Sequence, residues 1–407
     1  MDNPTSSPSK RFTAFSSAAN DGKAIGPGAL DSGSGTFVLA VPGWLAVQCY
    51  VTAGMRLPTD AATMRAQLPA DPAGGIGQFA DLIQAYAAAH AHCTFWHDHT
   101  LQDAVSCAAD IVHYNQKVPS YYGALTALLP KLALRPLEPT AVAQFATILE
   151  NLATQAQACA GHAESVHQGM KWFAEQTAQD QLTIAPLRAK YAKALGSQSP
   201  AIEQLAQQLG ADQQTLSQAQ DDYQRDVIVT STGATYAWIW PAGAIAAGVV
   251  TGIYGRKASD ALARVNAIKA TISTMPSELA AAATLLLDLT SIEGQLAGIG
   301  DQIASALPVL QTIQGAWTAI ASDMQNILTI IADDISAAPA LIKSLGIDDA
   351  LAAWAAVARE ADAYRNTAFI SVSAPARAKV AGLALQGSLV RLAKRSEAAR
   401  KRAANYM

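Results

Sequence analysis

Charged and aromatic residues are both scarce in this chain of 407 residues, at 15% and 6% of the composition. The net charge is only −4, so the chain has no overall positive charge that would suit binding to nucleic acid. Hydrophobic residues make up 51%, and alanine dominates them, which favours closely packed helices over a sheet sandwich. We therefore predict an all-α protein.

Cysteine is also rare. Cys49, Cys93, Cys107 and Cys159 show no C-x-x-C spacing and are too few for a disulfide scaffold, so they are predicted to be small buried side chains. The N-terminal region lacks an apolar core followed by a small-residue cleavage site, so secretion would need a route other than a Sec signal. Residues 1–36, rich in Ser, Gly and Pro, are predicted to form a flexible arm.

Apolar residues recur at steps of three and four along two long stretches, which predicts two long helices with one apolar face each. The second stretch would form a coiled-coil-like rod of roughly 60 Å, and Pro308 is expected to kink it. The first stretch comprises Val142, Phe145, Leu149, Leu152, Ala156, Cys159, Ala163, Val166, Met170 and Phe173, and the second comprises Ile292, Leu296, Ile299, Ile303, Leu307, Leu310, Ile313, Trp317, Ile320, Met324, Ile327, Ile331 and Ile335.

Shorter helices are predicted around these two. One begins after Pro42 and ends near Met55, one runs from Gly77 to Val118, and one from Leu341 to Tyr364. Four prolines between positions 119 and 139 predict a connector after the second of these helices.

No Asp, Glu, Lys or Arg occurs between Asp226 and Arg256. Pro241 divides this stretch into a first part rich in β-branched and aromatic residues and a second part rich in alanine and glycine. A β-hairpin and a helical hairpin, each turning at Pro241, both fit the pattern. A single membrane-spanning helix is a third alternative, which Pro241 and the glycines disfavour.

Residues 227–255 are here called the tongue, a segment predicted to insert into a membrane. Its Tyr and Trp side chains lie toward its margins, where such rings suit the lipid headgroup layer. Small residues at every fourth position would let helix backbones approach closely in lipid. The small residues are Ala244, Gly248 and Gly252, and the predicted inserting residues are Val227, Ile228, Val229, Tyr236, Trp238, Ile239, Trp240, Pro241, Ile245, Val249, Val250, Ile253 and Tyr254.

The tongue lies between the two long predicted helices, so the chain is expected to run out along one helix, turn at the tongue and return along the other. Residues 37–226 and 256–407 would then form a helical tail bundle, with the tongue as its head. The predicted fold is an elongated bundle with an apolar hairpin inserted between two helices. The alternative is a buried hairpin inside an ordinary helical domain, although at a tip only its own fold or another subunit could cover it.

Three features point to a known family. They are the early helix PGWLAVQCYVTAGMRLPTD, the segment HAHCTFWHDH followed by a helix and Lys117-Val118-Pro119, and the order long helix, apolar hairpin, long helix. In these features the chain resembles the α-helical pore-forming toxins of the cytolysin A type. It is most similar to the branch of the haemolysin BL and non-haemolytic enterotoxin components and the xenorhabdolysin A subunit.

The resemblance implies a five-helix tail bundle and a head that holds the tongue. It also implies conversion at a membrane into a ring-shaped oligomer, with one or two homologous partner components. By position it assigns only the tongue role, to residues 227–255, and it implies no catalytic residue and no cofactor. The alanine-rich composition and the long Ser/Gly arm depart from the family pattern.

Histidines crowd the stretch from His90 to His99. On a helix His90, Cys93 and His97 would share a face at a spacing that suits zinc, but no carboxylate lies on that face, so packing or surface roles are preferred and no metal is predicted. Histidines that charge together between about pH 5 and 7 would strain a packed bundle, which makes pH sensing a further alternative. The basic C-terminal segment would suit anionic lipid, but a solvated helix end is the preferred interpretation.

The sequence thus predicts a component of a secreted bacterial α-pore-forming toxin that converts from a soluble form to a membrane-inserted form. The expected partners are target-membrane lipids, further copies of the chain and homologous components. No catalytic set of side chains is recognisable, so no enzyme is predicted. The alternatives are a coiled-coil scaffold that uses the hairpin as a docking site, and an integral membrane protein with one span.

Overall fold

The computed structural model of this chain is built from helices. It describes residues 25–30, 37–39, 42–132 apart from position 73, 138–196, positions 200, 202, 204, 207, 208 and 211, position 267, and residues 270–333 and 346–367. Within these ranges there is no β-strand, so the prediction of an all-α protein is confirmed. The tongue lies outside the described residues.

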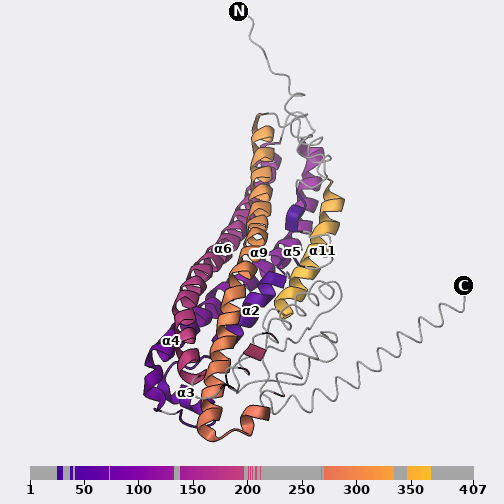
Figure 1. Ribbon diagram of the computed structural model, residues 1–407. Coiled ribbons are helices and arrows are strands. Elements are labelled where there is room, and N and C mark those ends of the chain that lie inside the picture. The colour runs from indigo at the N-terminus through magenta and orange to yellow at the C-terminus, as the bar shows by residue number, and fades with distance from the viewer. Residues whose placement is uncertain are drawn as a thin grey trace, which may run out of the picture. The chain divides into compact units, whose positions relative to one another are not determined.

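Three long helices, α5, α6 and α9, account for most of the described chain (Figure 1). Shorter helices, 3-10 turns and one π-helical turn, η3, precede α5. The elements in chain order are η1 (Gly28–Leu30), α2 (Pro42–Gly54), α3 (Ala61–Gln67), η2 (Ile76–Phe79), α4 (Ala80–Phe95), η3 (Trp96–Thr100), α5 (Leu101–Leu132), α6 (Pro139–Gly196), α9 (Ser277–Asp333) and α11 (Ile347–Thr367).

The two predicted apolar stripes become the buried faces of α6 and α9. On α6 only Val142 of the predicted residues is partly exposed, and the others are buried. On α9 only Leu307 is partly exposed among the predicted residues described, while Ile335 lies outside the described residues. The periodicity therefore identified both buried faces correctly. The helix α9 also continues through Pro308, whose side chain is exposed.

The predicted connector after Val118 is wrong in its first part, because α5 continues to Leu132 with Pro119 and Pro130 inside it. A proline within a helix costs a backbone hydrogen bond and about 3 kcal/mol. Here the apolar face persists beyond Pro119, with Tyr122, Leu125 and Leu128 all buried. Both prolines are exposed, so neither disturbs this packing. Burial of the apolar face offsets the lost hydrogen bonds, and the helix continues to Leu132.

The contacts divide the chain into two compact units, and α6 and α9 contribute to both of them. The first unit consists of residues 1–44, 96–172 and 303–369. The second unit consists of residues 45–95, 173–302 and 370–407.

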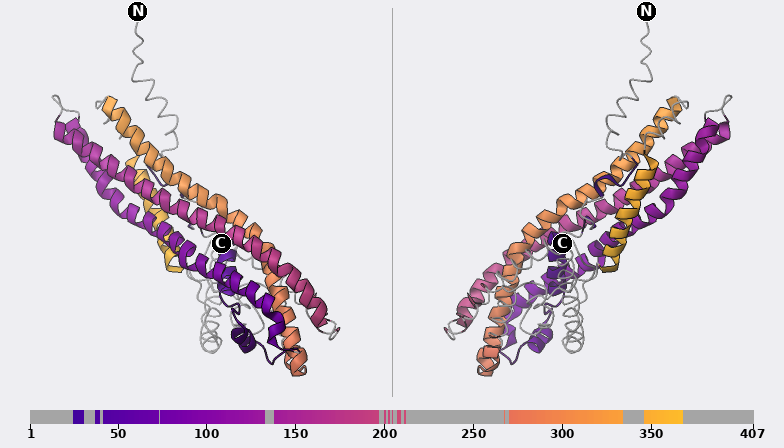
Figure 2. Two further views of the ribbon diagram at one scale, coloured as in Figure 1. Left: turned by 90° about the vertical axis from the view of Figure 1, so that its left-hand side faces the viewer. Right: turned by 90° about the vertical axis from the view of Figure 1, so that its right-hand side faces the viewer.

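An aromatic cluster fills the core of the first unit. The ring of Tyr114 on α5 lies 5.1 Å from Trp317 on α9 and 4.7 Å from Trp354 on α11. The two tryptophan rings stack at 5.5 Å. Packing of α11 along α5 therefore buries large rings from three helices in one place (Figure 2).

The flexible arm predicted for residues 1–36 does not extend through residues 25–30. Ile25 and Leu30 are buried in the first unit. The backbone carbonyl of Ile25 accepts hydrogen bonds from the hydroxyl of Tyr122, at 2.7 Å, and from the indole nitrogen of Trp354, at 2.9 Å. Composition alone misjudged this stretch, because two apolar side chains and one carbonyl suffice to hold it.

In the second unit α2 and α4 approach closely at Gly54. A Cβ atom at this position would lie 2.2 Å from the sulfur of Cys93, which is fully buried. The ring of Tyr50, which like Gly54 is on α2, lies 6.1 Å from the ring of Phe173 on α6. The glycine therefore lets α2 lie against α4 while an aromatic ring reaches α6.

We predict that Gly54→Ala lowers the free energy of unfolding by about 1–3 kcal/mol, because the added methyl group would overlap the Cys93 sulfur. Urea unfolding measures the change. Adding Cys93→Ala should recover part of the loss by removing the sulfur. As a control, Gly298→Ala on the exposed face of α9, where a Cβ meets nothing within 4 Å, should stabilise by about 0.5–1 kcal/mol. Equal stabilities of Gly54→Ala and the wild type would contradict the prediction.

Candidate functional site

The predicted inserting residues, from Val227 to Tyr254, lie outside the described residues, as do Ala244, Gly248 and Gly252. The structure instead describes the two helices that flank the tongue in the chain, α6 before it and α9 after it. None of the helices in the described ranges combines the length and the apolar character needed to cross a membrane. The candidate site is therefore sought in the second unit, which contains parts of the described helices before and after the tongue in the chain.

The flanking helices lie side by side in the second unit. There α6 ends at Gly196 and α9 begins at Ser277, toward the same end of the unit (Figure 2). The Nε of Arg188 on α6 lies 3.2 Å from a carboxylate oxygen of Glu293 on α9. In the chain α6 thus precedes the tongue and α9 follows it, and the out-and-back path through the tongue stays a prediction.

A polar cluster, here called the anchor, ties the end of α6 to the start of α4. It consists of Gln78, Phe79, Asp81, Lys190 and Tyr191. The hydroxyl of Tyr191 lies 2.8 Å from the backbone carbonyl of Gln78 and also contacts the Asp81 carboxylate, while Lys190 donates to Asp81 at 2.6 Å. The Tyr191 ring packs on Phe79 at 4.9 Å between centroids. The anchor holds α6 only one to two turns before its end.

Opposed effects act on the anchor carboxylate. Burial alone would raise the pKa of Asp81, but the hydrogen bonds from Lys190 and Tyr191 outweigh it and lower that pKa. The hydrogen bond to Asp81 in turn raises the pKa of Lys190. A carboxyl group with a lowered pKa stabilises the fold above its ordinary pKa and loses that contribution as the pH falls through the lowered value. The anchor therefore keeps the contribution of Asp81 at neutral pH and loses it in acid, below the ordinary pKa of an aspartate.

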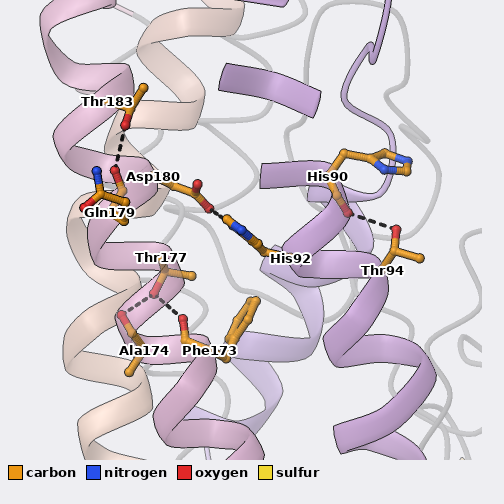
Figure 3. Close-up of polar contacts among 9 residues, drawn as sticks. All are labelled: His90, His92, Thr94, Phe173, Ala174, Thr177, Gln179, Asp180 and Thr183. Atoms are coloured by element: carbon orange, nitrogen blue, oxygen red, sulfur yellow. Dashed lines mark hydrogen bonds and ion pairs between the residues drawn. The ribbon is translucent and has the colours of Figure 1, made fainter. Parts of the chain in front are cut away.

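A second polar cluster, here called the Asp180 cluster, lies further along the same helices. It consists of Tyr50 from α2, His92 and Cys93 from α4, and Asp180 from α6. Figure 3 shows the His92 ring directed at the Asp180 carboxylate, with 3.0 Å between Nδ1 and Oδ2. The Asp180 side chain is only 5% exposed and that of His92 21%. A potential ion pair is therefore enclosed between helices.

Burial dominates the electrostatics of the Asp180 cluster. It raises the pKa of Asp180, and the hydrogen bond and charge of His92 only partly offset this effect. Burial likewise raises the pKa of Tyr50 and of Cys93 well above their ordinary values, and the nearby Asp180 charge raises both further. Tyr50 and Cys93 thus stay neutral, and Asp180 is the group that can change its charge.

The two clusters join α4 and α6 at matched positions. Eleven residues, or three helical turns, separate Asp81 from His92 on α4, and eleven separate Asp180 from Tyr191 on α6. Because the partners run in opposite order, α4 and α6 pair antiparallel with one register across both clusters. Two polar links thus define how α6 lies against α4.

The histidine-rich stretch does not converge on one point. Cys93 is buried beside Gly54, whereas His90 points away from the Asp180 cluster (Figure 3). His97 lies 2.8 Å from its neighbour Asp98. Across the described ranges, no three His, Cys, Asp or Glu side chains come together as a group that could hold a metal ion.

Burial of the cysteines is confirmed for those whose side chains are described. Cys93, Cys107 and Cys159 are buried and free. Burial raises the pKa of Cys159 to about 12 and that of Cys107 further still. These thiols are therefore inert packing groups.

Sequence reasoning missed Asp81, Asp180 and Tyr191. Asp180 had a usable signal, because it follows Phe173 by seven residues and so continues the buried stripe of α6 with a carboxylate. Asp81 and Tyr191 had none, since each has the composition of an ordinary helix end. Their role depends on contacts between residues more than one hundred positions apart.

Residues 76–219 match the family of the Bacillus haemolytic enterotoxin (HBL). The resemblance predicted from the sequence is confirmed. The matched segment includes η2, α4, α5 and α6, and thus most residues of both clusters. No curated protein sequence matches the chain.

Solved structures share the fold. The Bacillus cereus HblL1 toxin component is 17% identical, with a TM-score of 0.61 over 86% of this chain and 99% of that one. Soluble SmhA of the tripartite α-pore-forming toxin Smh from Serratia marcescens is 15% identical, with a TM-score of 0.55 over 86% and 97%. Soluble AhlB of the tripartite toxin AHL from Aeromonas hydrophila is 13% identical, with a TM-score of 0.51 over 81% and 96%. At these identities the likeness establishes the fold.

We predict that Tyr191→Phe loosens the end of α6 while the ring contact with Phe79 persists. Loss of the hydroxyl removes the bond to the Gln78 carbonyl and should lower the free energy of unfolding by about 1 kcal/mol. Hydrogen exchange should rise in the last turns of α6 and around Asp81. Lys193→Met, at an exposed position of the same helix outside the anchor, is the matched control and should change exchange much less. Equal effects of the two variants would argue against the anchor.

Proposed function

We propose that this chain is a component of a secreted bacterial α-pore-forming toxin, and that its tongue enters the target membrane. One observation carries the proposal. A segment with no charged side chain, between Asp226 and Arg256, lies in the chain between α6 and α9, in a fold shared with components of such toxins. The family match over residues 76–219 supports the same assignment.

Insertion of the tongue would be driven by transfer of apolar surface from water to lipid. Each square ångström removed from water contributes roughly 25 cal/mol, so a segment of this length can contribute many kcal/mol. The inserting side chains would be those predicted above, from Val227 to Tyr254, with Pro241 at the turn. Ala244, Gly248 and Gly252 would let two backbones pack closely inside the bilayer.

The proposed organisation assigns separate roles to the parts of the chain. Residues 37–226 and 256–407 would act as the tail bundle and residues 227–255 as the head. The function requires no cofactor and no catalytic step, because the work is done by a change of conformation and environment.

The proposed partners are lipids of the target-cell membrane, further copies of this chain and one or two homologous components. SmhA and AhlB are described as parts of tripartite toxins, which supports an assembly with homologous components. The chain would be secreted in a soluble form and converted at the host membrane. Nucleic acid has no part in this function.

We predict that the double variant Ile245→Asp and Val249→Asp stays folded but no longer releases dye from liposomes, alone or mixed with homologous components. Each buried charge costs several kcal/mol in the hydrocarbon layer. Leu182→Asp is the matched control, because it places the same charge on an apolar side chain of α6 that is already 71% exposed. The control should leak like the wild type.

Two results would count against the proposal. One is a wild-type protein that releases no dye in any mixture of components. The other is a double variant that releases dye as fast as the wild type. A scaffold protein would instead lose a protein partner in the double variant and show no response to lipid in either form.

A further inference from the structure

Asp180 is a carboxylate enclosed between helices of the second unit, on α6, the long helix that precedes the tongue in the chain. We propose that Asp180 and His92 form a proton-dependent latch between α4 and α6. The latch is closed when the pair has taken up one proton and is neutral overall. It is weakened when the pair has released that proton and keeps one net negative charge. This inference rests on the proposed function for its link to the tongue.

The geometry of the pair supports the latch. His92 and Asp180 come from different helices, and their facing atoms are 3.0 Å apart. With only 5% of the Asp180 side chain exposed, water can solvate its charge very little. The carboxylate depends on His92 for compensation.

Among the described residues with a resolved electrostatic effect on Asp180, His92 is the one that brings positive charge. Tyr50 of α2 and Cys93 of α4 feel the Asp180 charge and are themselves held neutral by burial. On α6, Arg188 pairs with Glu293 of α9. The charge of His92 is the one that acts on Asp180.

The proton count sets the strength of the latch. After the pair has taken up a proton, its two side chains together carry no net charge. After release the pair keeps the uncompensated charge of a buried carboxylate, the costly arrangement inside a protein.

The direction of the pH effect follows from Asp180. Burial raises its pKa, and His92 offsets only part of the rise. A group with a raised pKa gives stability that is complete below its ordinary pKa and is lost as the pH rises through the raised value. Acid therefore closes the latch and neutral pH weakens it. The clustered histidines alone would suggest the opposite pH effect, a bundle that is strained in acid.

The latch and the anchor act in different pH ranges on the same pair of helices. The anchor, with the lowered pKa of Asp81, loses strength below the ordinary range of an aspartate. The latch loses strength above that range. Near neutral pH the anchor alone holds α6 to α4 at full strength, so the helix that leads to the tongue is then easiest to release.

Hydrogen exchange of the intact protein tests the latch, with rates in α4 and in residues 173–196 of α6 corrected for the intrinsic effect of pH. In the wild type, opening of these segments should be several-fold more frequent at about pH 8 than at about pH 5, because the raised pKa of Asp180 makes its charged form costly. Asp180→Asn stays neutral and still accepts a bond from His92. It should show low opening at both values, and a pH dependence equal to that of the wild type would overturn the latch.

Asp323→Asn is the matched control. Burial raises the pKa of Asp323 as well, but this residue lies on α9 in the first unit. The variant should leave the pH dependence of hydrogen exchange in α4 and α6 unchanged. Loss of that pH dependence in the variant would overturn the assignment to Asp180.

A second variant covers the case in which Asp180→Asn fails to fold. His92→Gln keeps a hydrogen-bond donor but cannot become positive. It should open more often than the wild type at about pH 5, because the charge of His92 that offsets the burial of Asp180 is gone. Opening equal to that of the wild type at this pH would overturn the latch.

Dye release from liposomes separates the latch from the proposed function. The wild type should release dye faster at about pH 8 than at about pH 5, and Asp180→Asn should be slow at both values. Leakage by neither protein in any mixture contradicts the proposed function, while the exchange data still decide the latch. Equal leakage by both proteins at both pH values, with the latch present in exchange, overturns its role in tongue release.

Discussion

The antiparallel contact between α4 and α6 is the constraint on which the behaviour proposed for the second unit depends. The sequence of α4 is rich in alanine, and small side chains leave a helix surface with few features that favour one register over another. The polar links supply that preference. A slip of α6 by one residue would separate Asp180 from His92 and leave its charge buried and unpaired, at a cost of about 3–5 kcal/mol. Polar contacts thus specify an arrangement that apolar packing alone leaves loosely defined.

Those parts of the fold that follow from periodicity could be predicted from the sequence. The buried faces of α6 and α9 were evident because an apolar side chain every three or four residues needs only local geometry. The course of α5 beyond Pro119 was not, since it depends on whether distant helices bury Tyr122 and Leu125. The place of Ile25 in the core depends in the same way on Trp354, 329 positions away in the chain. Local sequence patterns identify which faces of a helix are buried. Tertiary contacts decide whether a local cost, such as the hydrogen bond lost at Pro119, is tolerated.

The candidate site likewise divides into features that are local in the sequence and features that depend on tertiary contacts. Absence of charge marks the tongue, because composition over a continuous stretch is a local property. The anchor and the latch join residues 88 to 113 positions apart. Asp180 in the buried stripe of α6 signals that some partner must exist, but His92 becomes that partner only through the register of α4. The four other histidines between His90 and His113 have similar sequence surroundings, so nothing local distinguishes His92 from them.

The magnitudes assign different roles to the tongue and to the polar links between α4 and α6. Burial of apolar tongue surface on the order of 1,000 Å² in lipid would contribute about 25 kcal/mol. A hydrogen bond such as that of Tyr191 contributes about 1 kcal/mol, and protonation of one buried group shifts stability by about 1.4 kcal/mol for each pKa unit. The links are too weak to decide whether insertion is favourable. They are strong enough to set how often α6 separates from α4, since 1.4 kcal/mol changes an equilibrium population tenfold. The tongue would therefore determine the final state, and the latch the rate at which it is reached.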